Sequence, residues 1–381
     1  MSRLKTCIVL PSLSPYWHSR LKALVTHKTL DVSLCLDQAL RDDHPEQQVQ
    51  KIDGVKTYIL QSTILKSTAT SHDLNFIIQG RRSIPFRLFF VLWKIRPDIV
   101  VLCNATQILI TLPLRLLLNF KIALIVEDTP HARRNSDGPV KHFKAWAYRQ
   151  CDLFFPYSND ALAFLHNSGI SDNIRRSSWS LDMETFRPLT MASPEQQKTK
   201  VIFVGRLISG KGIMLLLEAW QQLSAKTLLE TELIIVGSGP LEEDINLFIQ
   251  NNGLDGIMLK GQINYTQIVT ELQNSDLFIL PTLQDLFSLT VLEAMACGCP
   301  AITTNYNGAR ELITVDKTGW IVDPHNIKEM TQVLQYALSD KCDLKNMGQM
   351  ARIRVEKMDN KIVMANFAKD LHYQTNNTEL L

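Results

Sequence analysis

Two carboxylates, Asp285 and Glu293, lie eight positions apart after a strand-like run that ends at Pro281. A helix is expected to begin near Ser288, so a short polar turn and the helix start separate the two side chains. Carboxylates placed in this way can reach two parts of one elongated polar ligand. Free backbone N–H groups between them form an anion site, and these donors are expected on Leu286, Phe287, Ser288, Leu289 and Thr290. The pattern favours a ligand in which a diphosphate joins a sugar to a nucleoside.

A simpler interpretation is that Asp285 caps the helix and that Glu293 is a solvated helical residue. Against it, residues 294–299 are small or apolar. A charge on such a closely packed helix is costly unless it meets a partner. A pair of sugar hydroxyl groups is one such partner.

A second group of residues lies on the loop from Gly205 to Gly212. A β-branched and aromatic strand ends at Gly205, and a helix-forming run starts at Ile213. Arg206 and Lys211 therefore lie on a strand-to-helix loop, where ligands bind in open parallel sheets. Two cations and several glycines suit a diphosphate, although a solvated loop remains the alternative.

The same loop spells Gly-x-x-x-x-Gly-Lys from Gly205 to Lys211, which makes a P-loop NTPase a competing interpretation. That pattern requires Ser or Thr next, to hold Mg²⁺, and here Gly212 follows. No apolar run ending in Asp supplies a second metal-binding strand. The turn at 237–240 resembles a dinucleotide fingerprint without its third glycine, so we interpret it as a tight strand-to-helix turn lining the donor cleft.

Together these motifs resemble those of the family 4 retaining glycosyltransferases. The resemblance is carried by Val-Gly-Arg-Leu-x-x-x-Lys-Gly, Ile-Ile-Val-Gly-Ser-Gly-Pro and Asp-x7-Glu-Ala-Met-Ala-Cys-Gly, within residues 198–340. It implies the GT-B fold, an α/β architecture of two Rossmann-like doubly wound domains facing across a cleft. The N-terminal acceptor domain would span 1–190 and the donor domain 191–355, with 356–381 as a helix crossing back to the first domain.

The resemblance also implies roles for single residues. Arg206 and Lys211, next to Gly205, would hold the donor diphosphate, and Glu293 would bind the ribose. Asp285 would contact the transferred sugar, although the family usually has Glu there. His131, after the strand at 122–126, would contact the sugar or the acceptor, with a surface histidine as the alternative. The glycine-rich loop that many relatives have after the first strand is absent at 11–17.

The reaction implied is metal-independent and retaining, with no resident cofactor. The donor would be a UDP-, GDP- or ADP-sugar, and the acceptor a saccharide or a lipid-linked saccharide of the cell envelope. A sugar-nucleotide epimerase and a non-catalytic nucleotide-sugar-binding protein of the same fold are the two rival functions. An epimerase would convert the free donor, whereas a binding protein would leave it unchanged.

Composition agrees with two domains, because the chain has 381 residues. Forty basic and thirty-eight acidic residues give a net charge of +2, which argues against nucleic-acid binding. Seven scattered cysteines indicate reduced thiols in the cytoplasm, and Cys297 and Cys299 are too close together for a zinc site. We expect no signal peptide, and the uncharged run from Ile99 to Leu114 is a strand and a helix rather than a membrane span.

The pattern of apolar runs predicts the sheets. In the second half, strands are expected at 200–205, 232–237, 257–261, 276–281 and 301–304, alternating with helices at 212–224, 240–252, 264–274 and 288–298. In the first half, strands are expected at 6–10, 32–36, 57–60, 98–102, 121–126 and 152–155. Residues 81–96 mix cations with bulky apolar side chains. They are expected to form a buried helix with charged ends or to dock peripherally on an anionic membrane.

Overall fold

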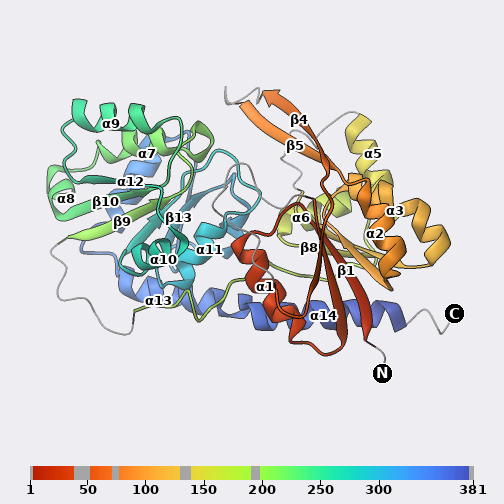
Figure 1. The fold of residues 1–381 in the computed structure, drawn as a ribbon. Coiled ribbons are helices and arrows are strands. Elements are labelled where there is room, and N and C mark those ends of the chain that lie inside the picture. Colours follow the sequence, from red (N-terminus) through yellow and green to blue (C-terminus); the bar gives the residue numbers. More distant parts are fainter. Residues whose placement is uncertain (1–2, 38–51, 71–76, 129–138, 190–197, 377–381) are drawn as a thin grey trace. The chain divides into compact units, whose positions relative to one another are not determined.

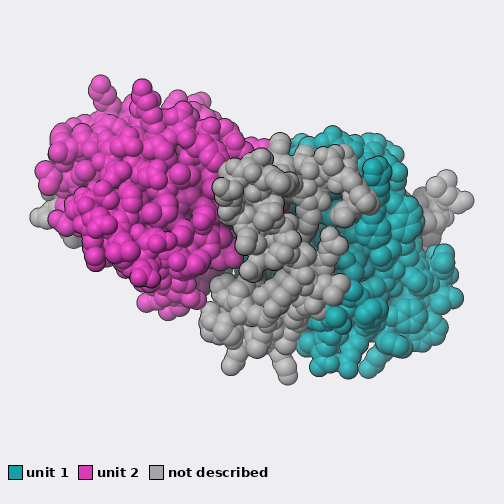
Figure 2. Space-filling model, turned by 90° about the horizontal axis from the view of Figure 1, so that it is seen from above, with its two compact units in different colours: residues 1–182, 358–381 teal, residues 183–357 magenta. Residues whose placement is uncertain are grey.

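The computed structural model describes residues 3–37, 52–70, 77–128, 139–189 and 198–376 (Figure 1). The chain divides into two compact units, shown in two colours in Figure 2. Unit 1 comprises Met1–Asp182 and Met358–Leu381, and unit 2 comprises Met183–Lys357. Each unit contains its own six-stranded sheet.

The sheet of unit 1 is parallel throughout, with strand order β3-β2-β1-β6-β7-β8. Its central strands are nearly continuous apolar runs that are buried on both faces, as expected for a parallel sheet covered by helices. The order reverses between β1 and β6, which is where such folds bind ligands. The strands are β1 (Leu4–Leu10), β2 (Leu30–Leu36), β3 (Lys56–Ile59), β6 (Ile99–Leu102), β7 (Lys121–Val126) and β8 (Leu153–Pro156).

Helices cover both faces of this sheet. Right-handed crossovers place the helix that leads from β1 to β2 on one face, and the helices that lead to β6, β7 and β8 on the other. The helices are α1 (Pro15–Val25), α2 (Arg87–Ile95), α3 (Ala105–Leu118), α5 (Pro139–Tyr148), α6 (Asn159–Asn167) and α14 (Asn360–Asn376). Helix α14 packs against α1, whereas α2 and α5 both pack against α3 (Figure 1). An antiparallel hairpin of β4 (Thr63–Thr70) and β5 (Ile77–Ile84) precedes α2.

Unit 2 repeats this plan, with strand order β11-β10-β9-β12-β13-β14 and parallel pairing throughout. Here the order reverses between β9 and β12. The strands are β9 (Thr199–Val204), β10 (Thr231–Val236), β11 (Ile257–Gly261), β12 (Leu277–Ile279), β13 (Ala301–Thr304) and β14 (Gly319–Val322).

The helices of unit 2 start at recognisable caps. Asn264 and Gln267 form a capping box at the start of α10, and Ser224 caps α8. The helices are α7 (Ile213–Trp220), α8 (Ala225–Glu230), α9 (Glu242–Asn251), α10 (Tyr265–Gln273), α11 (Leu289–Ala296), α12 (Ile327–Ala337) and α13 (Leu344–Val355). Short 3₁₀ turns occur at η1 (Ser209–Lys211), η2 (Gly308–Leu312) and η3 (Glu356–Met358).

The chain leaves unit 1 after Asp182 and re-enters it at Met358. The two passages are joined by backbone hydrogen bonds, because Leu181 N donates to Met358 O and Asn360 N donates to Leu181 O. The last helix, α14, therefore belongs to the compact unit formed by the first half of the chain.

The prediction of two Rossmann-like parallel-sheet domains is confirmed. Residues 99–114 form β6 and the first part of α3, so the strand-and-helix interpretation of that run is also confirmed. The prediction of one buried helix over 81–96 is wrong. Backbone pairing places Arg81 and Arg82 in β5, α2 starts only at Arg87, and Phe90 on it is 72% exposed.

Candidate functional site

The loop after β9 is fixed against the loop after β12. Thr282 Oγ1 and Leu283 N each donate to the carbonyl oxygen of Gly210, both at 2.9 Å. Gly212 has φ +69°, and a Cβ atom there would overlap the carbonyl oxygen of Pro281. A Ser or Thr at 212, which a P-loop needs, does not fit this backbone. The structure therefore gives a steric reason for the residue that breaks the P-loop pattern.

The Gly237–Gly239 turn packs on the same loop from the other side. Leu207 N donates to Ser238 O at 2.9 Å, and Leu241 N donates to Leu207 O at 3.1 Å. A Cβ atom at Gly237 would overlap the carbonyl oxygen of Gly205, so this glycine permits close backbone contact. Three strand-to-helix connections thus form one rigid backbone layer at the carboxyl ends of β9, β10 and β12.

Lys211 and Asp285 form an ion pair across this layer. Lys211 Nζ lies 2.5 Å from Asp285 Oδ2, and the two side chains are only 19% and 16% exposed. The backbone of Asp285 is held as well, because its N–H donates to Tyr306 O and its carbonyl accepts from Gly308 N. Asp285 therefore does not cap α11, and Lys211 is not a freely solvated lysine.

Arg206 lies at the start of the same loop, one residue after Gly205, and its side chain is exposed. Within the described parts of the chain it forms no side-chain hydrogen bond or ion pair. Its guanidinium group is therefore available to an anion, whereas the ammonium group of Lys211 already has a partner.

The start of α11 differs from the expectation in one respect. Ser288 N donates to Asn307 Oδ1 at 3.1 Å, and Asn307 is fully buried. The prediction that all N–H groups from 286 to 290 are free is therefore wrong at Ser288. The N–H groups of Leu289 and Thr290 donate to no other described residue. Two donors of the first turn thus remain for an anion, and Asn307 orients that turn.

Glu293 is 5% exposed on the second turn of α11. Tyr265 Oη donates to its Oε1 at 3.3 Å. Burial raises the pKa of this carboxyl to about 7, and the hydrogen bond from Tyr265 opposes the shift. The interpretation of Glu293 as a solvated residue is wrong. A nearly buried acid with a single long hydrogen bond has spare acceptor capacity for hydroxyl groups of a ligand.

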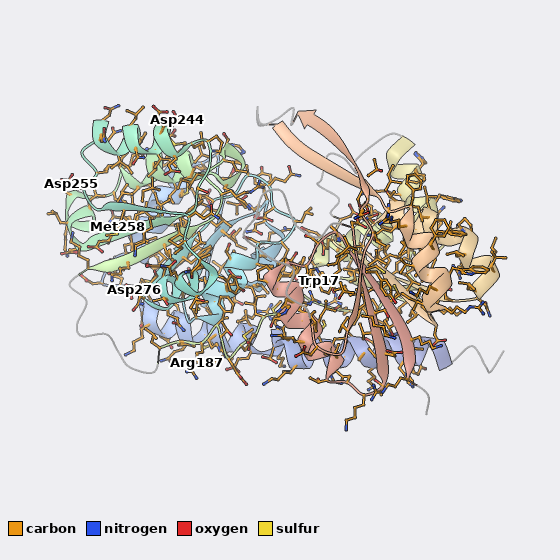
Figure 3. All side chains as sticks on the ribbon, viewed as in Figure 1. Trp17, Arg187, Asp244, Asp255, Met258 and Asp276 are labelled. Carbon is orange, nitrogen blue, oxygen red and sulfur yellow. The ribbon has the colours of Figure 1, made fainter. Side chains whose placement is uncertain are left out.

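Unit 1 has its own polar cluster at the carboxyl ends of its strands. Arg20, on α1, is fully buried and donates from Nη2 to Tyr157 Oη at 2.7 Å. Its guanidinium carbon lies 4.5 Å from the ring centroid of Trp17 and 4.7 Å from that of Tyr157. Trp17 is labelled in Figure 3. The other two guanidinium nitrogens, Nε and Nη1, are buried and have no hydrogen-bond partner among the described residues.

Acidic groups lie at the ends of β7 and β2, and the one after β7, Glu127, interacts electrostatically with this arginine. The pKa of Glu127 is raised to about 7, mainly by burial. The positive charge of Arg20 opposes this rise, and the negative charge of Asp128 adds to it.

Burial also raises the pKa of Asp37, and hydrogen bonding with Ser83, Ser62 and Gln107 opposes the rise. Only the bond from Ser83 to Oδ2 has good geometry, and Oδ1 has no well-aligned partner among the described residues. The edge of unit 1 therefore presents both donors and acceptors that the protein itself does not satisfy.

His131, the proposed acceptor contact, lies outside the described residues. Its neighbour Asp128 is described, and it forms an ion pair with Lys144 Nζ at 2.6 Å and accepts a hydrogen bond from Tyr148. The position of His131 relative to this network stays a prediction.

Sequence analysis missed Tyr265, Asn307 and Arg20. The Asn307-Gly308 pair after a strand is a turn signal that could have indicated a cap. Trp17 and Arg20 are three positions apart, which is a same-face spacing on a helix. Tyr265 gave no signal, because its contact with Glu293 joins residues 28 positions apart.

Residues 191–354 match the family model described as Glycosyl transferases group 1. WcaL of Escherichia coli (strain K12), assigned to colanic acid biosynthesis as a glycosyltransferase, is 27% identical over 226 residues. That alignment covers 57% of this chain and 55% of WcaL. The chain spans about half the length of the curated relatives it matches. The part that matches the family model includes Arg206, Lys211, Asp285 and Glu293.

Solved structures match over nearly the whole chain. Sucrose-phosphate synthase from Thermosynechococcus elongatus has a TM-score of 0.73 at 18% identity, covering 99% of this chain and 100% of that chain. Anabaena Alr3699/HepE in complex with UDP has a TM-score of 0.74 at 14% identity, covering 98% and 100%. At these identities the likeness establishes the fold. The chain has the two-domain GT-B architecture, and most of its second unit matches the glycosyltransferase group 1 model.

Proposed function

We propose that this protein is a retaining glycosyltransferase that moves a sugar from a nucleoside diphosphate donor to a hydroxyl acceptor in cell-envelope glycan or glycolipid synthesis. The observation that carries the proposal is the Lys211–Asp285 ion pair, held on the same backbone layer that begins the helix of Glu293. The family match over residues 191–354 supports it, as does the likeness of part of the chain to WcaL. The fold is also shared with a protein solved in complex with UDP.

The donor binds to unit 2 through three kinds of contact. The exposed guanidinium of Arg206 and the ammonium of Lys211 bind the diphosphate, together with the N–H groups of Leu289 and Thr290. Glu293 accepts hydrogen bonds from the ribose hydroxyls. These bonds stabilise the ionised carboxylate and bring its pKa down from about 7. Diphosphate and ribose are therefore recognised at the two ends of one short segment.

Donor binding changes the partner of Lys211. In the structure Asp285 neutralises this cation, whereas a bound diphosphate would attract it. The carboxylate of Asp285 is then free to accept hydrogen bonds from hydroxyls of the transferred sugar. When Lys211 exchanges Asp285 for the diphosphate, diphosphate binding is linked to placement of the sugar. A lysine without a carboxylate partner could not make this link.

In the reaction, the bond between the anomeric carbon and the diphosphate oxygen breaks, and a bond to the acceptor oxygen forms on the same face. Negative charge grows on the diphosphate, and Arg206 and Lys211 stabilise it. A phosphate oxygen of the donor takes the acceptor proton. These two cations replace a divalent metal ion, and the chain contains no Asp-x-Asp motif of metal-dependent transferases.

The acceptor binds to unit 1. Arg20 contributes two unpartnered buried nitrogens, Asp37 one unpartnered oxygen, and Glu127 a carboxyl with a pKa of about 7. Such a set of donors and acceptors suits a hydroxyl-rich saccharide. His131, four residues after Glu127, is a further candidate contact.

The test is a binding screen of UDP-, GDP- and ADP-sugars, followed by mass analysis of products with and without envelope acceptors and with EDTA. A glycosylated acceptor formed in the presence of EDTA supports the proposal. Conversion of the donor without any acceptor would identify an epimerase instead. Tight donor binding with neither transfer nor slow donor hydrolysis would identify a binding protein.

We also place the protein in the cytoplasm or peripherally at the cytoplasmic membrane face, where nucleotide sugars and lipid-linked acceptors meet. In the described part of the chain, no helix has the length and apolar character needed to cross a membrane. Cell fractionation tests this location, and release of a membrane-bound fraction by salt indicates peripheral binding.

A further inference from the structure

One face of the sheet in unit 1 is covered by α2, α3 and α5, which pack side by side (Figure 1). The inner side chains of α2 and α3 are well buried, including Leu88, Leu92, Ile108 and Leu114. Their outer side chains are unusual for a protein surface exposed to water, because most of them are apolar.

Large apolar side chains are exposed on both α2 and α3. Phe90 on α2 is 72% exposed, and Leu116 and Leu117 on α3 are 89% and 67% exposed. Phe86 and Trp93 extend this set along α2, and Phe143 and Trp146 add a stacked aromatic pair on α5. We call the outer face formed by Phe86, Arg87, Phe90, Trp93, Lys94, Leu116 and Leu117 the α2–α3 surface. Soluble proteins rarely expose apolar residues in such a concentration unless the surface binds something.

The charged side chains on these three helices are all basic. None of α2, α3 and α5 contains an Asp or a Glu. Arg87 and Lys94 are exposed on α2, and Arg96 follows it with its guanidinium 5.8 Å from the ring of Trp93. Cations interleaved with aromatic and leucine side chains, without acids, match the interfacial zone of an anionic bilayer.

The exposed apolar residues of unit 2 form a useful contrast. Leu229 is 73% exposed on α8 and Leu247 is 50% exposed on α9. Acidic residues accompany both of them, because Glu230 follows Leu229 and α9 begins with Glu242, Glu243 and Asp244. Helix α9 is acidic, and in α8 the charge of Glu230 is balanced by Lys226, so neither helix would attract an anionic membrane. Exposure alone therefore does not distinguish the α2–α3 surface; its charge does.

We propose that the α2–α3 surface docks on an anionic lipid bilayer, with its aromatic and leucine side chains in the interface and its cations at the headgroups. A second copy of this chain fits less well, because a symmetric contact would place two acid-free cationic surfaces against each other. The inference specifies how the proposed peripheral association occurs. It concerns binding only, so it can fail while the transferase function holds.

The experiment is sedimentation of the full-length protein with vesicles of phosphatidylcholine, with or without phosphatidylglycerol. We expect binding to require phosphatidylglycerol and to weaken as salt is added. The double variant Phe90→Ser/Leu116→Ser should lower the fraction bound by about tenfold or more, because two large apolar groups no longer enter the interface. The variant Arg87→Gln/Lys94→Gln should weaken binding only to the anionic vesicles.

The matched control is Leu229→Ser/Leu247→Ser, which removes two equally bulky exposed leucines from unit 2 and should leave vesicle binding unchanged. Circular dichroism melting and donor binding show whether each variant is folded. Equal losses in the test and control variants would overturn the proposal, as would undiminished binding by Phe90→Ser/Leu116→Ser. If these substitutions instead converted a dimer to a monomer without changing vesicle binding, the surface would be a self-association interface and the proposal would be wrong.

Discussion

The two units have the same sheet plan, but their polar groups at the carboxyl ends of the strands are arranged in opposite ways. In unit 2, Lys211 is paired with Asp285, and Asn307 binds the N–H of Ser288. In unit 1, Arg20 keeps two buried nitrogens without a partner and Asp37 keeps one oxygen. Buried polar groups without partners cost stability, so the edge of unit 1 is incomplete by itself.

This difference indicates two modes of ligand recognition. The charged groups at the edge of unit 2 already have partners within the protein, so this edge is preorganised. A ligand that binds there replaces one of these partners. The edge of unit 1 is unsatisfied, and a ligand or water supplies partners that the protein lacks. We therefore expect substitutions in unit 2 to affect chemistry most strongly, and those in unit 1 to separate stability from acceptor use.

The largest expected effect is at Lys211. Lys211→Gln should lower kcat by about 10²–10³-fold, or ~2.7–4 kcal/mol, because it removes a preorganised cation from the leaving diphosphate. Steady-state kinetics with the identified donor and acceptor measure this loss. Lys260→Gln is the control, since Lys260 forms an ion pair of the same 2.5 Å length with Glu271 in the same unit. Similar losses in both variants would contradict the role of Lys211.

Glu293 should have an effect on stability that depends on pH. The pKa of Glu293 is raised from 4.5 to about 7 in the folded protein, so ionisation of this carboxyl disfavours the folded state. Its contribution to the free energy of unfolding is therefore fully present below pH 4.5 and is lost as the pH rises through about 7. Glu293→Gln should therefore be more stable than wild type by roughly 3 kcal/mol at pH 8, with little difference near pH 5.

Urea unfolding at the two pH values measures this difference, and titration calorimetry should show weaker nucleotide binding by Glu293→Gln. The side-chain amide of Gln keeps the contact with Tyr265, so packing is preserved. If Glu293→Gln were less stable than wild type at pH 8, the prediction would be wrong. The carboxylate of Glu293 would then be ionised in the folded protein and stabilised there by polar contacts.

Arg20 tests the other half of the comparison. Arg20→Met replaces a buried cation that has unpartnered nitrogens with an apolar side chain of similar length. The variant no longer buries a charge whose nitrogens lack partners, which offsets the hydrogen bond to Tyr157 that it loses. We expect thermal stability to be kept or raised while acceptor-dependent turnover falls and donor affinity stays unchanged. Melting curves and separate donor and acceptor titrations check this, and loss of folding would make Arg20 a structural residue only.

The sequence predicted five of the six strands of the unit 2 sheet, because these strands are apolar runs of three to six residues followed by glycine or polar turns, but it missed β14. It also proposed Arg206, Lys211, Asp285 and Glu293 as site residues, because their spacing along the chain is part of a known pattern. It could not predict the Lys211–Asp285 pair or the Tyr265–Glu293 contact. These contacts join residues 74 and 28 positions apart, and only the packing of the strand ends brings them together.

The failure at 81–96 has a different cause. Arg81 and Arg82 alternate with neighbours in a β hairpin, whereas the residues from Arg87 onward follow a helical period. A mixture of cations and bulky apolar residues is compatible with both, so composition alone did not locate the boundary. The β4–β5 hairpin forms a separate two-stranded sheet and does not pair with the six-stranded sheet of unit 1. The apolar runs that indicated the strands of the main sheet therefore did not indicate this hairpin.

The smallest expected effect is at Asp285, and it tests whether the unit 2 edge works by partner exchange. Asp285→Asn keeps the shape of the side chain but leaves Lys211 without its anion. Nucleoside diphosphate affinity should then rise by about two- to fivefold, or up to ~1 kcal/mol, because the lysine no longer has to give up a charged partner to bind the phosphates. Turnover should fall nevertheless, since the amide is a poorer acceptor for hydroxyls of the transferred sugar. Asp285→Glu, which restores the residue usual in the family, is the control and should keep wild-type affinity. If Asp285→Asn bound the nucleotide as weakly as Glu293→Gln, the two carboxylates would share one role, and the exchange of partners at Lys211 would be wrong.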